Sequence, residues 1–170
     1  MQLYHGSNTN IINIQLSVCR PYKDFGKGFY LTDIKEQALN MAKRVVRLYG
    51  GAPFVNVYEF NASCLNDLAL RIKRFEPVPT EDWAEFIMNN RNRHFKETSD
   101  PLCNLDNKYD IVIGPVANDD ISALFRQFTD GLISKEILVQ NLTYRELTKQ
   151  YSFHTEKAIR LLHKIGVIHE

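Results

Sequence analysis

The stretch Asp24-Phe25-Gly26-Lys27-Gly28-Phe29-Tyr30-Leu31-Thr32 is the part of this sequence that carries most information about the fold. Its two glycines permit unusual backbone angles or the close approach of a ligand, because neither has a Cβ atom. Phe29 and Tyr30 alternate along a predicted strand and therefore point to opposite faces. We expect one ring to lie in the core and the other to stack on a ligand ring. The alternative is a glycine-entered strand whose aromatic residues all belong to the core.

A second short motif, Tyr4-His5-Gly6-Ser7, lies near the start of the sequence and predicts a strand that ends at a glycine. A strand-end imidazole can bond a ribose hydroxyl group. The backbone N–H and C=O of the next glycine can take up a carboxamide, which needs one donor and one acceptor. The alternative is that His5 only ends the strand and bonds a nearby carbonyl group.

Composition excludes several classes of function. The 170 residues include 21 basic and 20 acidic side chains, and this balance argues against nucleic acid as an obligate partner. No run of about 18 apolar residues predicts a membrane span, and the first residues, which show no signal-peptide pattern, are expected to form a strand. We expect one domain, residues 1–170, in a reducing cytoplasm.

Metal chemistry is not expected. Cys19, Cys64 and Cys103 are widely spaced and form no CxxC pair. The histidines show no HExxH spacing. Asp119-Asp120 follows a Gly-Pro pair and is interpreted as a helix cap, with an acid/base pair as the alternative.

The order of predicted elements is mixed and indicates an α+β fold. Residues 89–108 are polar and basic and are expected to form a surface connection. Periodicity and capping signals predict strands over residues 3–5, 28–32, 54–60, 109–115 and 150–154, and helices over residues 34–49, 80–88, 121–130, 134–142 and 156–165.

The predicted strand near the C-terminus has a polar face. Gln150 and Ser152 share it, whereas Tyr151 and Phe153 share the other face. The polar row is expected either to line a ligand cleft or to face solvent. Glu156 follows in the first turn of the next helix, where a negative charge is favourable regardless of function.

Four segments together resemble a bacterial domain family of unknown function that is grouped with the ADP-ribosyltransferase superfamily: residues 4–7, 24–32, 109–119 and 150–155. The first two also look like the His and Tyr motifs of poly(ADP-ribose) polymerases and diphtheria-toxin-like enzymes, the H-Y-E group. The resemblance implies a split two-sheet ADP-ribosyltransferase-like fold of the α+β class with flanking helices. NAD would be bound as substrate in the cleft, without a metal.

The same resemblance implies roles for individual residues. His5 would hold a ribose hydroxyl, Gly6 the carboxamide and Tyr30 the nicotinamide ring, and Gln150 occupies the place of the catalytic Glu. A glutamine can bond a ribose but carries no charge to stabilise a developing cation. The implied NAD-binding set comprises Tyr4, His5, Gly6, Ser7, Arg20, Phe25, Gly26, Gly28, Phe29, Tyr30, Thr32 and Gln150.

Two functions are therefore weighed. The first is an NAD-dependent ADP-ribosyltransferase, with His5, Tyr30 and Gln150 as catalytic residues, that modifies a protein or nucleic-acid acceptor and releases nicotinamide. The second is a catalytically weak or inactive module on the same fold, which binds NAD, another nucleotide or, through the basic 89–108 segment, a protein. An antitoxin or a regulatory protein is considered as a partner in either case.

Overall fold

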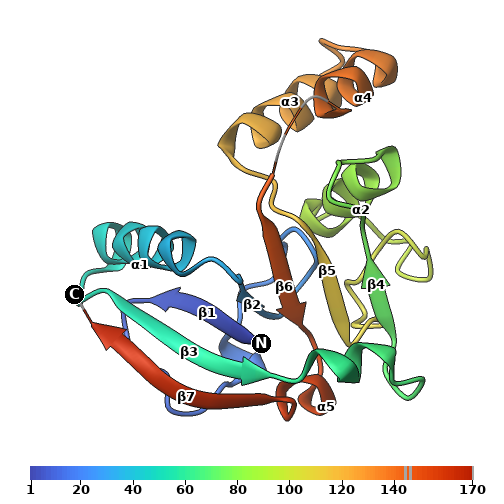
Figure 1. Ribbon diagram of the computed structural model, residues 1–170. Coiled ribbons are helices and arrows are strands. Elements are labelled where there is room, and N and C mark those ends of the chain that lie inside the picture. The colour runs from blue at the N-terminus through green and yellow to red at the C-terminus, as the bar shows by residue number, and fades with distance from the viewer. Residues whose placement is uncertain (144, 146, 170) are drawn as a thin grey trace.

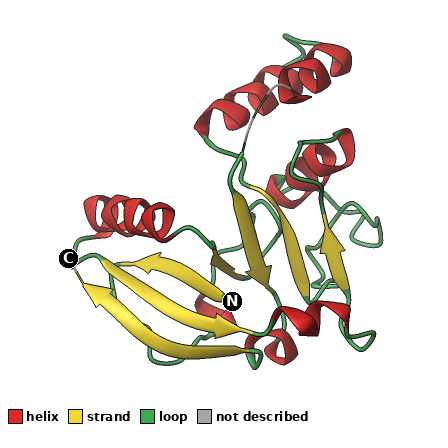
Figure 2. Cartoon of the chain, in the orientation of Figure 1, coloured by secondary structure: helices red, strands yellow, loops and turns green. Residues whose placement is uncertain are grey.

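The structure, a computed structural model, describes residues 1–143, 145 and 147–169. Two sheets organise these residues (Figures 1 and 2). The first is antiparallel, in the order β1-β3-β7, and contains β1 (Gln2–Ser7), β3 (Phe54–Phe60) and β7 (Leu162–His169). The second has the order β2-β6-β5-β4 and contains β2 (Phe29–Leu31), β6 (Lys149–Phe153), β5 (Ile111–Pro115) and β4 (Ile72–Arg74), the last parallel to β5.

Helices flank both sheets. α1 (Lys35–Tyr49) packs on β1 and β3 of the first sheet. The other long helices share a core cluster with the second sheet: α2 (Glu81–Arg91), α3 (Asp119–Thr129) and α4 (Lys135–Thr143). Figure 1 shows α3 and α4 as a pair beyond the ends of β5 and β6. One-turn helices lie at η1 (Leu16–Val18), η2 (Ala62–Asn66) and α5 (Glu156–Ile159). The mixed α+β class with two sheets is confirmed.

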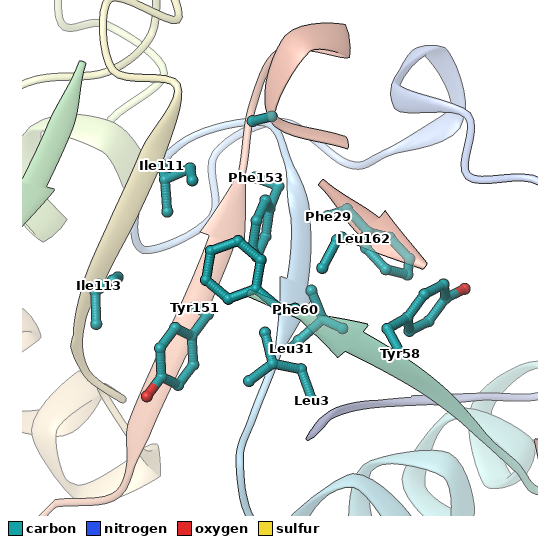
Figure 3. Packing of buried hydrophobic residues seen from close by; sticks show 11 residues of the cluster. Leu3, Phe29, Leu31, Tyr58, Phe60, Ile111, Ile113, Tyr151, Phe153 and Leu162 are labelled. Carbon is teal, nitrogen blue, oxygen red and sulfur yellow. The ribbon is translucent and has the colours of Figure 1, made fainter. Parts of the chain in front are cut away.

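The core has two parts, one on each face of the second sheet. The first part fills the space between the sheets, where the rings of Phe60 and Phe153 pack edge to face with their centroids 5.4 Å apart (Figure 3). The second part lies under the helices and is centred on Phe25, Trp83 and Phe86, all fully buried. The Trp83 indole N–H donates to the Pro115 carbonyl at 3.1 Å, so this large side chain leaves no unpaired donor in the core.

Helices α2 and α3 begin with side-chain caps, whereas the first helix, α1, follows Ile34 and has no side-chain cap at Thr32 or Asp33. Thr80 accepts a hydrogen bond from the Trp83 N–H, and Asn118 accepts one from the Ile121 N–H. Asp119 and Asp120 follow in the first exposed turn of α3, where acidic side chains favour the positive helix end. They form exposed ion pairs with Arg44 and Arg145, so they are not a buried acid/base pair.

The closing helix predicted over residues 156–165 is wrong. Only Glu156–Ile159 is helical, and Leu162–His169 forms strand β7, which pairs with β3. Its side chains alternate between the sheet face and solvent, and Ile165 and Val167 are exposed. The apolar residues had matched helical spacing, but β3 would have kept an open edge without β7, and β-branched residues favour a strand.

Candidate functional site

Strands β1 and β2 touch at a single point and then diverge. The Tyr4 N–H donates to the Thr32 carbonyl at 2.8 Å, and the Thr32 N–H donates to the Tyr4 carbonyl at 3.0 Å. Continuing this antiparallel register would place Gly6 opposite Tyr30. Among the described residues no backbone hydrogen bond joins Gly6 to Tyr30, whose other edge lies against Ser152 of the second sheet. The two strands therefore part after the Tyr4–Thr32 bridge, and we call the unpaired stretch between Gly6 and Tyr30 the gap.

The backbone of Gly6 faces this gap. In an antiparallel strand the N–H and C=O of one residue point to the same edge, and successive residues alternate. Because Tyr4 directs both groups toward Thr32, Gly6 directs both groups toward the same edge. Neither group has a partner on that edge among the described residues. Gly6 therefore offers one free donor and one free acceptor side by side.

Helix α1 explains why this position is glycine. A Cβ atom on Gly6 would lie 1.9 Å from the Ala38 carbonyl oxygen and 2.7 Å from the Ala42 nitrogen. Both atoms belong to the backbone and cannot swing away. The glycine is thus required for the packing of α1 on β1, independently of any ligand.

His5 bridges the two diverging strands. Its Nδ1 lies 2.7 Å from the Tyr30 carbonyl oxygen, which only accepts, so Nδ1 carries the proton. The ring stacks on Phe29 with centroids 4.3 Å apart. Burial lowers the pKa of His5 and outweighs the opposite effect of the bond to Tyr30. At neutral pH the imidazole is therefore uncharged, and Nε2 is an acceptor without a partner among the described residues.

The Tyr30 hydroxyl is hydrogen-bonded to the loop of residues 24–28, called here the glycine loop. It donates to the Gly26 carbonyl at 2.7 Å and accepts from the Phe25 N–H at 2.9 Å. Burial, followed by the charge of Asp24, raises the pKa of Tyr30 well above its ordinary value, so the hydroxyl stays protonated. These bonds fix the position of the half-buried ring beside the gap.

The glycine loop itself is internal structure. Gly26 has φ of 90°, which favours glycine. A Cβ atom on Gly28 would lie 2.6 Å from Nδ1 of the buried His154. Phe25 is fully buried and Phe29 nearly so, hence both rings pack in the core, one on each side of the second sheet. Phe25 and Gly26 hold the Tyr30 hydroxyl through their backbone atoms, Gly28 makes room for His154, and the Phe29 ring packs on His5.

The other residues of the predicted set make local contacts. Thr32 donates to Gln37 at 2.7 Å and accepts from the Ile34 N–H, so it organises the start of α1. The Tyr4 hydroxyl donates to Gln2, and Ser7 contacts Thr9. The guanidinium group of Arg20 lies over the Tyr49 ring, 4.6 Å from its centroid, and donates to the Tyr49 hydroxyl. Arg20 thus packs on the end of α1.

Gln150 lies on the same face of the second sheet as Tyr30, at the start of β6. Tyr30 is opposite Ser152, and Gln150 is two residues away along the strand, which makes it a diagonal neighbour of Tyr30. Its side-chain Nε2 donates to Asp24 Oδ2 at 2.9 Å and to the Pro115 carbonyl at 3.2 Å. Tyr30 and Gln150 therefore share one face of the second sheet, whereas the His5 ring stacks on Phe29, which points to the other face; His5 reaches Tyr30 through the Tyr30 carbonyl group.

Sequence reasoning missed Asp24 and Arg91 as parts of this junction. Arg91 donates from Nε and Nη2 to Asp24 Oδ1, at 3.0 and 2.6 Å. The predicted surface connection at 89–108 also differs from the structure, because Asn90 and Asn104 are fully buried. Both bond the glycine loop, through the carbonyl groups of Asp24 and Phe25. The sequence signal that could have identified Asp24 is an acidic residue directly before the Phe-Gly pair.

Two cavities lie away from the junction. One, of about 260 Å³, lies among α2, α3 and α4, and the other, of about 360 Å³, adjoins Leu16, Asn107 and Thr155. Within the described ranges, no group of three His, Cys, Asp or Glu side chains is placed to hold a metal ion. None of the helices described here is long and apolar enough to cross a membrane.

Comparison with known proteins gives a family and no activity. No curated protein matches the chain, and no solved structure matches it. A family model described as a protein of unknown function (DUF3990) matches residues 1–164, which is nearly the whole length. The chain therefore belongs to this family, DUF3990.

Proposed function

We propose that the domain binds NAD in the gap between β1 and β2 and transfers ADP-ribose to a macromolecular acceptor. The observation that carries the proposal is the divergence of the two strands, which leaves the N–H and C=O of Gly6 unpaired opposite Tyr30. A primary carboxamide needs one donor and one acceptor, and Gly6 has both on one edge. The resemblance of the two motifs to the H-Y-E enzymes supports the same ligand.

The nicotinamide ring would stack on Tyr30 while Gly6 holds its carboxamide. Nε2 of His5 would accept a hydrogen bond from a ribose hydroxyl, because Nδ1–H is already committed to the Tyr30 carbonyl. The side-chain carbonyl of Gln150 would accept one from the nicotinamide ribose. These contacts position the substrate, and positioning is a large part of catalysis in such transfers.

In the reaction, the bond between nicotinamide nitrogen and ribose C1′ breaks, and its electron pair leaves with nicotinamide. Positive charge develops on the ribose, and a nucleophilic atom of the acceptor then bonds C1′ and releases its proton to solvent. The Gln150 oxygen would stabilise this charge through its dipole alone, which is weaker than a carboxylate. We therefore expect a slow transferase.

Binding of NAD without turnover is the second candidate. It is favoured by Gln150, since the side chain at this position is neutral and its donor end is held by Asp24. The two candidates share the binding site and differ only in nicotinamide release and label transfer.

Replacing His5 by alanine is expected to weaken NAD binding about tenfold or more, because one hydrogen bond to a hydroxyl is lost and the strands lose their bridge. Isothermal calorimetry with NAD measures the affinity. Incubation with labelled NAD and a cell lysate measures nicotinamide release and label on macromolecules. His5→Asn is the matched control, because its amide can still donate to the Tyr30 carbonyl but has no acceptor at the place of Nε2.

If His5→Ala folds and binds NAD with unchanged affinity, the proposed site is wrong. Label transfer that disappears in both His5 variants would support the transferase. NAD binding by the wild-type protein without release or transfer would support the second candidate.

Tyr30→Ala is expected to weaken NAD binding by about 10- to 100-fold, because stacking on an aromatic ring contributes about 1–3 kcal/mol. Tyr30→Phe keeps the ring and removes only the hydroxyl bonds to Phe25 and Gly26. Its NAD affinity is expected to stay within about threefold of wild type, with a loss of about 1–2 kcal/mol in the free energy of unfolding. Calorimetry and urea denaturation of both variants separate these effects, and equal affinities of Tyr30→Ala and wild type would exclude stacking.

A further inference from the structure

Asp24 is a half-buried carboxylate, and both of its oxygens accept hydrogen bonds. Its side chain is 13% exposed. Oδ1 accepts two hydrogen bonds from Arg91, and Oδ2 accepts from the Ala117 N–H at 3.2 Å and from Gln150 Nε2 at 2.9 Å. Every one of these contacts places a donor against the carboxylate. The residue at position 150 must therefore present a donor to Asp24.

This requirement determines the orientation of the Gln150 amide. A primary amide has two N–H donors, and both have acceptors here, one on Asp24 Oδ2 and one on the Pro115 carbonyl. Flipping the amide would place its oxygen against two acceptors. The side-chain oxygen Oε1 has no donor among the described residues, yet it is absent from their buried unpaired side-chain atoms, which are Tyr58 Oη and Asn107 Oδ1. Oε1 therefore keeps access to solvent.

We propose that Asp24 is the positioning residue of this site: it holds Gln150 by Nε2, so that Oε1 is presented as a neutral acceptor to the ribose of NAD. The inference rests on the proposed function for the identity of the ligand. It also explains the absence of a glutamate at position 150. A carboxylate there would meet Asp24 Oδ2 and the Pro115 carbonyl with no proton between them, and Arg91 is already paired with Asp24.

Position 24 and position 150 are thus a matched pair. One combination is a carboxylate at 24 with an amide at 150. The reverse combination, an amide at 24 with a carboxylate at 150, restores one donor between the two side chains. Gln150→Glu alone brings two carboxylates, both acceptors, into contact. Asp24→Asn alone brings two amides into contact, and each amide can then take either orientation.

The test compares Gln150→Glu, Asp24→Asn and the double variant by thermal unfolding between pH 4 and pH 8. The introduced carboxyl group of Gln150→Glu is expected to keep its proton at low pH and to repel Asp24 when it ionises. Its folded-state pKa is then raised above the unfolded value, so stability is lost as the pH rises. We expect a melting temperature close to wild type at pH 4 and about 5–10 °C lower at pH 8.

The double variant is expected to regain at least half of the loss at pH 8. Ser122→Ala is the control, since it removes another partner of Arg91, at 2.9 Å, without touching Asp24 or Gln150. Its melting temperature should run parallel to that of wild type across the pH range. A Gln150→Glu curve that is also parallel to wild type, or a double variant without recovery, would overturn the pairing of the two residues.

Calorimetry with NAD tests whether the bond between Asp24 and Gln150 contributes to NAD affinity. Asp24→Asn is expected to bind NAD about tenfold more weakly, because Oε1 is no longer held toward the ligand. Ser122→Ala is expected to bind like wild type. Unchanged affinity in Asp24→Asn would overturn the positioning role. If the wild-type protein binds no NAD, the proposed function and the ligand named here both fail, while the melting curves still decide whether Asp24 orients the amide.

Discussion

Replacing Gly6 by alanine is expected to lower the free energy of unfolding by about 3 kcal/mol or more, and little folded protein should be recovered. The new methyl group would lie 1.9 Å from the Ala38 carbonyl oxygen, so α1 must move away from β1. Overpacking usually costs about 1–3 kcal/mol, and here the obstructing atoms are backbone atoms that cannot change rotamer. Urea denaturation followed by circular dichroism measures the loss.

Gly166→Ala is the matched control for this prediction. Gly166 also lies within a strand, β7, and a Cβ atom there would meet no atom within 4 Å. Its free energy of unfolding should stay within about 1 kcal/mol of wild type. Equal stability of the Gly6→Ala and Gly166→Ala variants would contradict the packing of α1 described above. Because Gly6→Ala disturbs the fold, loss of NAD binding in that variant is no test of carboxamide recognition.

Acidification from pH 7 to pH 4 is expected to remove about 3 kcal/mol of stability through His154 alone. Burial lowers the pKa of His154 to about 4, against smaller opposite effects from the Lys27 carbonyl and Asp110. When the pH falls, His154 is therefore protonated at a higher pH in the unfolded chain than in the folded protein. The stabilising contribution is complete above about pH 6.5 and is lost as the pH falls toward 4. His5, whose pKa burial also lowers, adds to the same slope.

Urea denaturation at a series of pH values measures this slope. His154→Gln is expected to flatten it between pH 6.5 and pH 4. The exposed His163, replaced by glutamine, is the control and should leave it unchanged. A wild-type protein whose free energy of unfolding is constant from pH 7 to pH 4.5 would contradict the buried, neutral state of His154.

A second acid transition is expected at lower pH from Asp110. Burial by itself raises the pKa of this carboxyl group, but hydrogen bonds from Arg71, Thr155 and Lys157 outweigh it and lower the pKa to about 2. The stabilising contribution is therefore present above the unfolded value near 4 and is lost as the pH falls toward 2. Asp110→Asn is expected to remove this second transition and to leave the first one in place.

Local elements were predicted well because their causes are local. The strand over residues 54–60 has the predicted bounds, and the caps at Thr80 and Asn118 bond backbone N–H groups three residues further on. The C-terminal strand was not predicted because its apolar residues also fit a helix, and only the open edge of β3 favours the strand. The two glycine motifs indicated a candidate site, but they did not show which of their residues pack in the core and which remain available to a ligand.

The candidates His5, Gly6, Tyr30 and Gln150 were proposed from the sequence, because each lies in a short contiguous motif that carries the resemblance. Asp24 stood in the quoted stretch without a role. Its partner Gln150 is 126 positions away, and no periodicity connects two such residues. Arg91 was assigned to a surface connection since a polar, basic run is usually solvated, whereas in the structure it pairs with the half-buried carboxylate of Asp24.

The sequence by itself determined the α+β class, most strands and helices, and the two motifs at the junction of the sheets. Tertiary structure decided that β1 and β2 part after Tyr4 and Thr32, that Gly6 is required by α1, and that Asp24 and the Pro115 carbonyl hold the amide nitrogen of Gln150. The physical reason is the sequence distance over which each interaction acts. Propensity, capping and alternation act over a few residues, whereas strand divergence, backbone contact and amide orientation depend on atoms that meet only after the chain has folded.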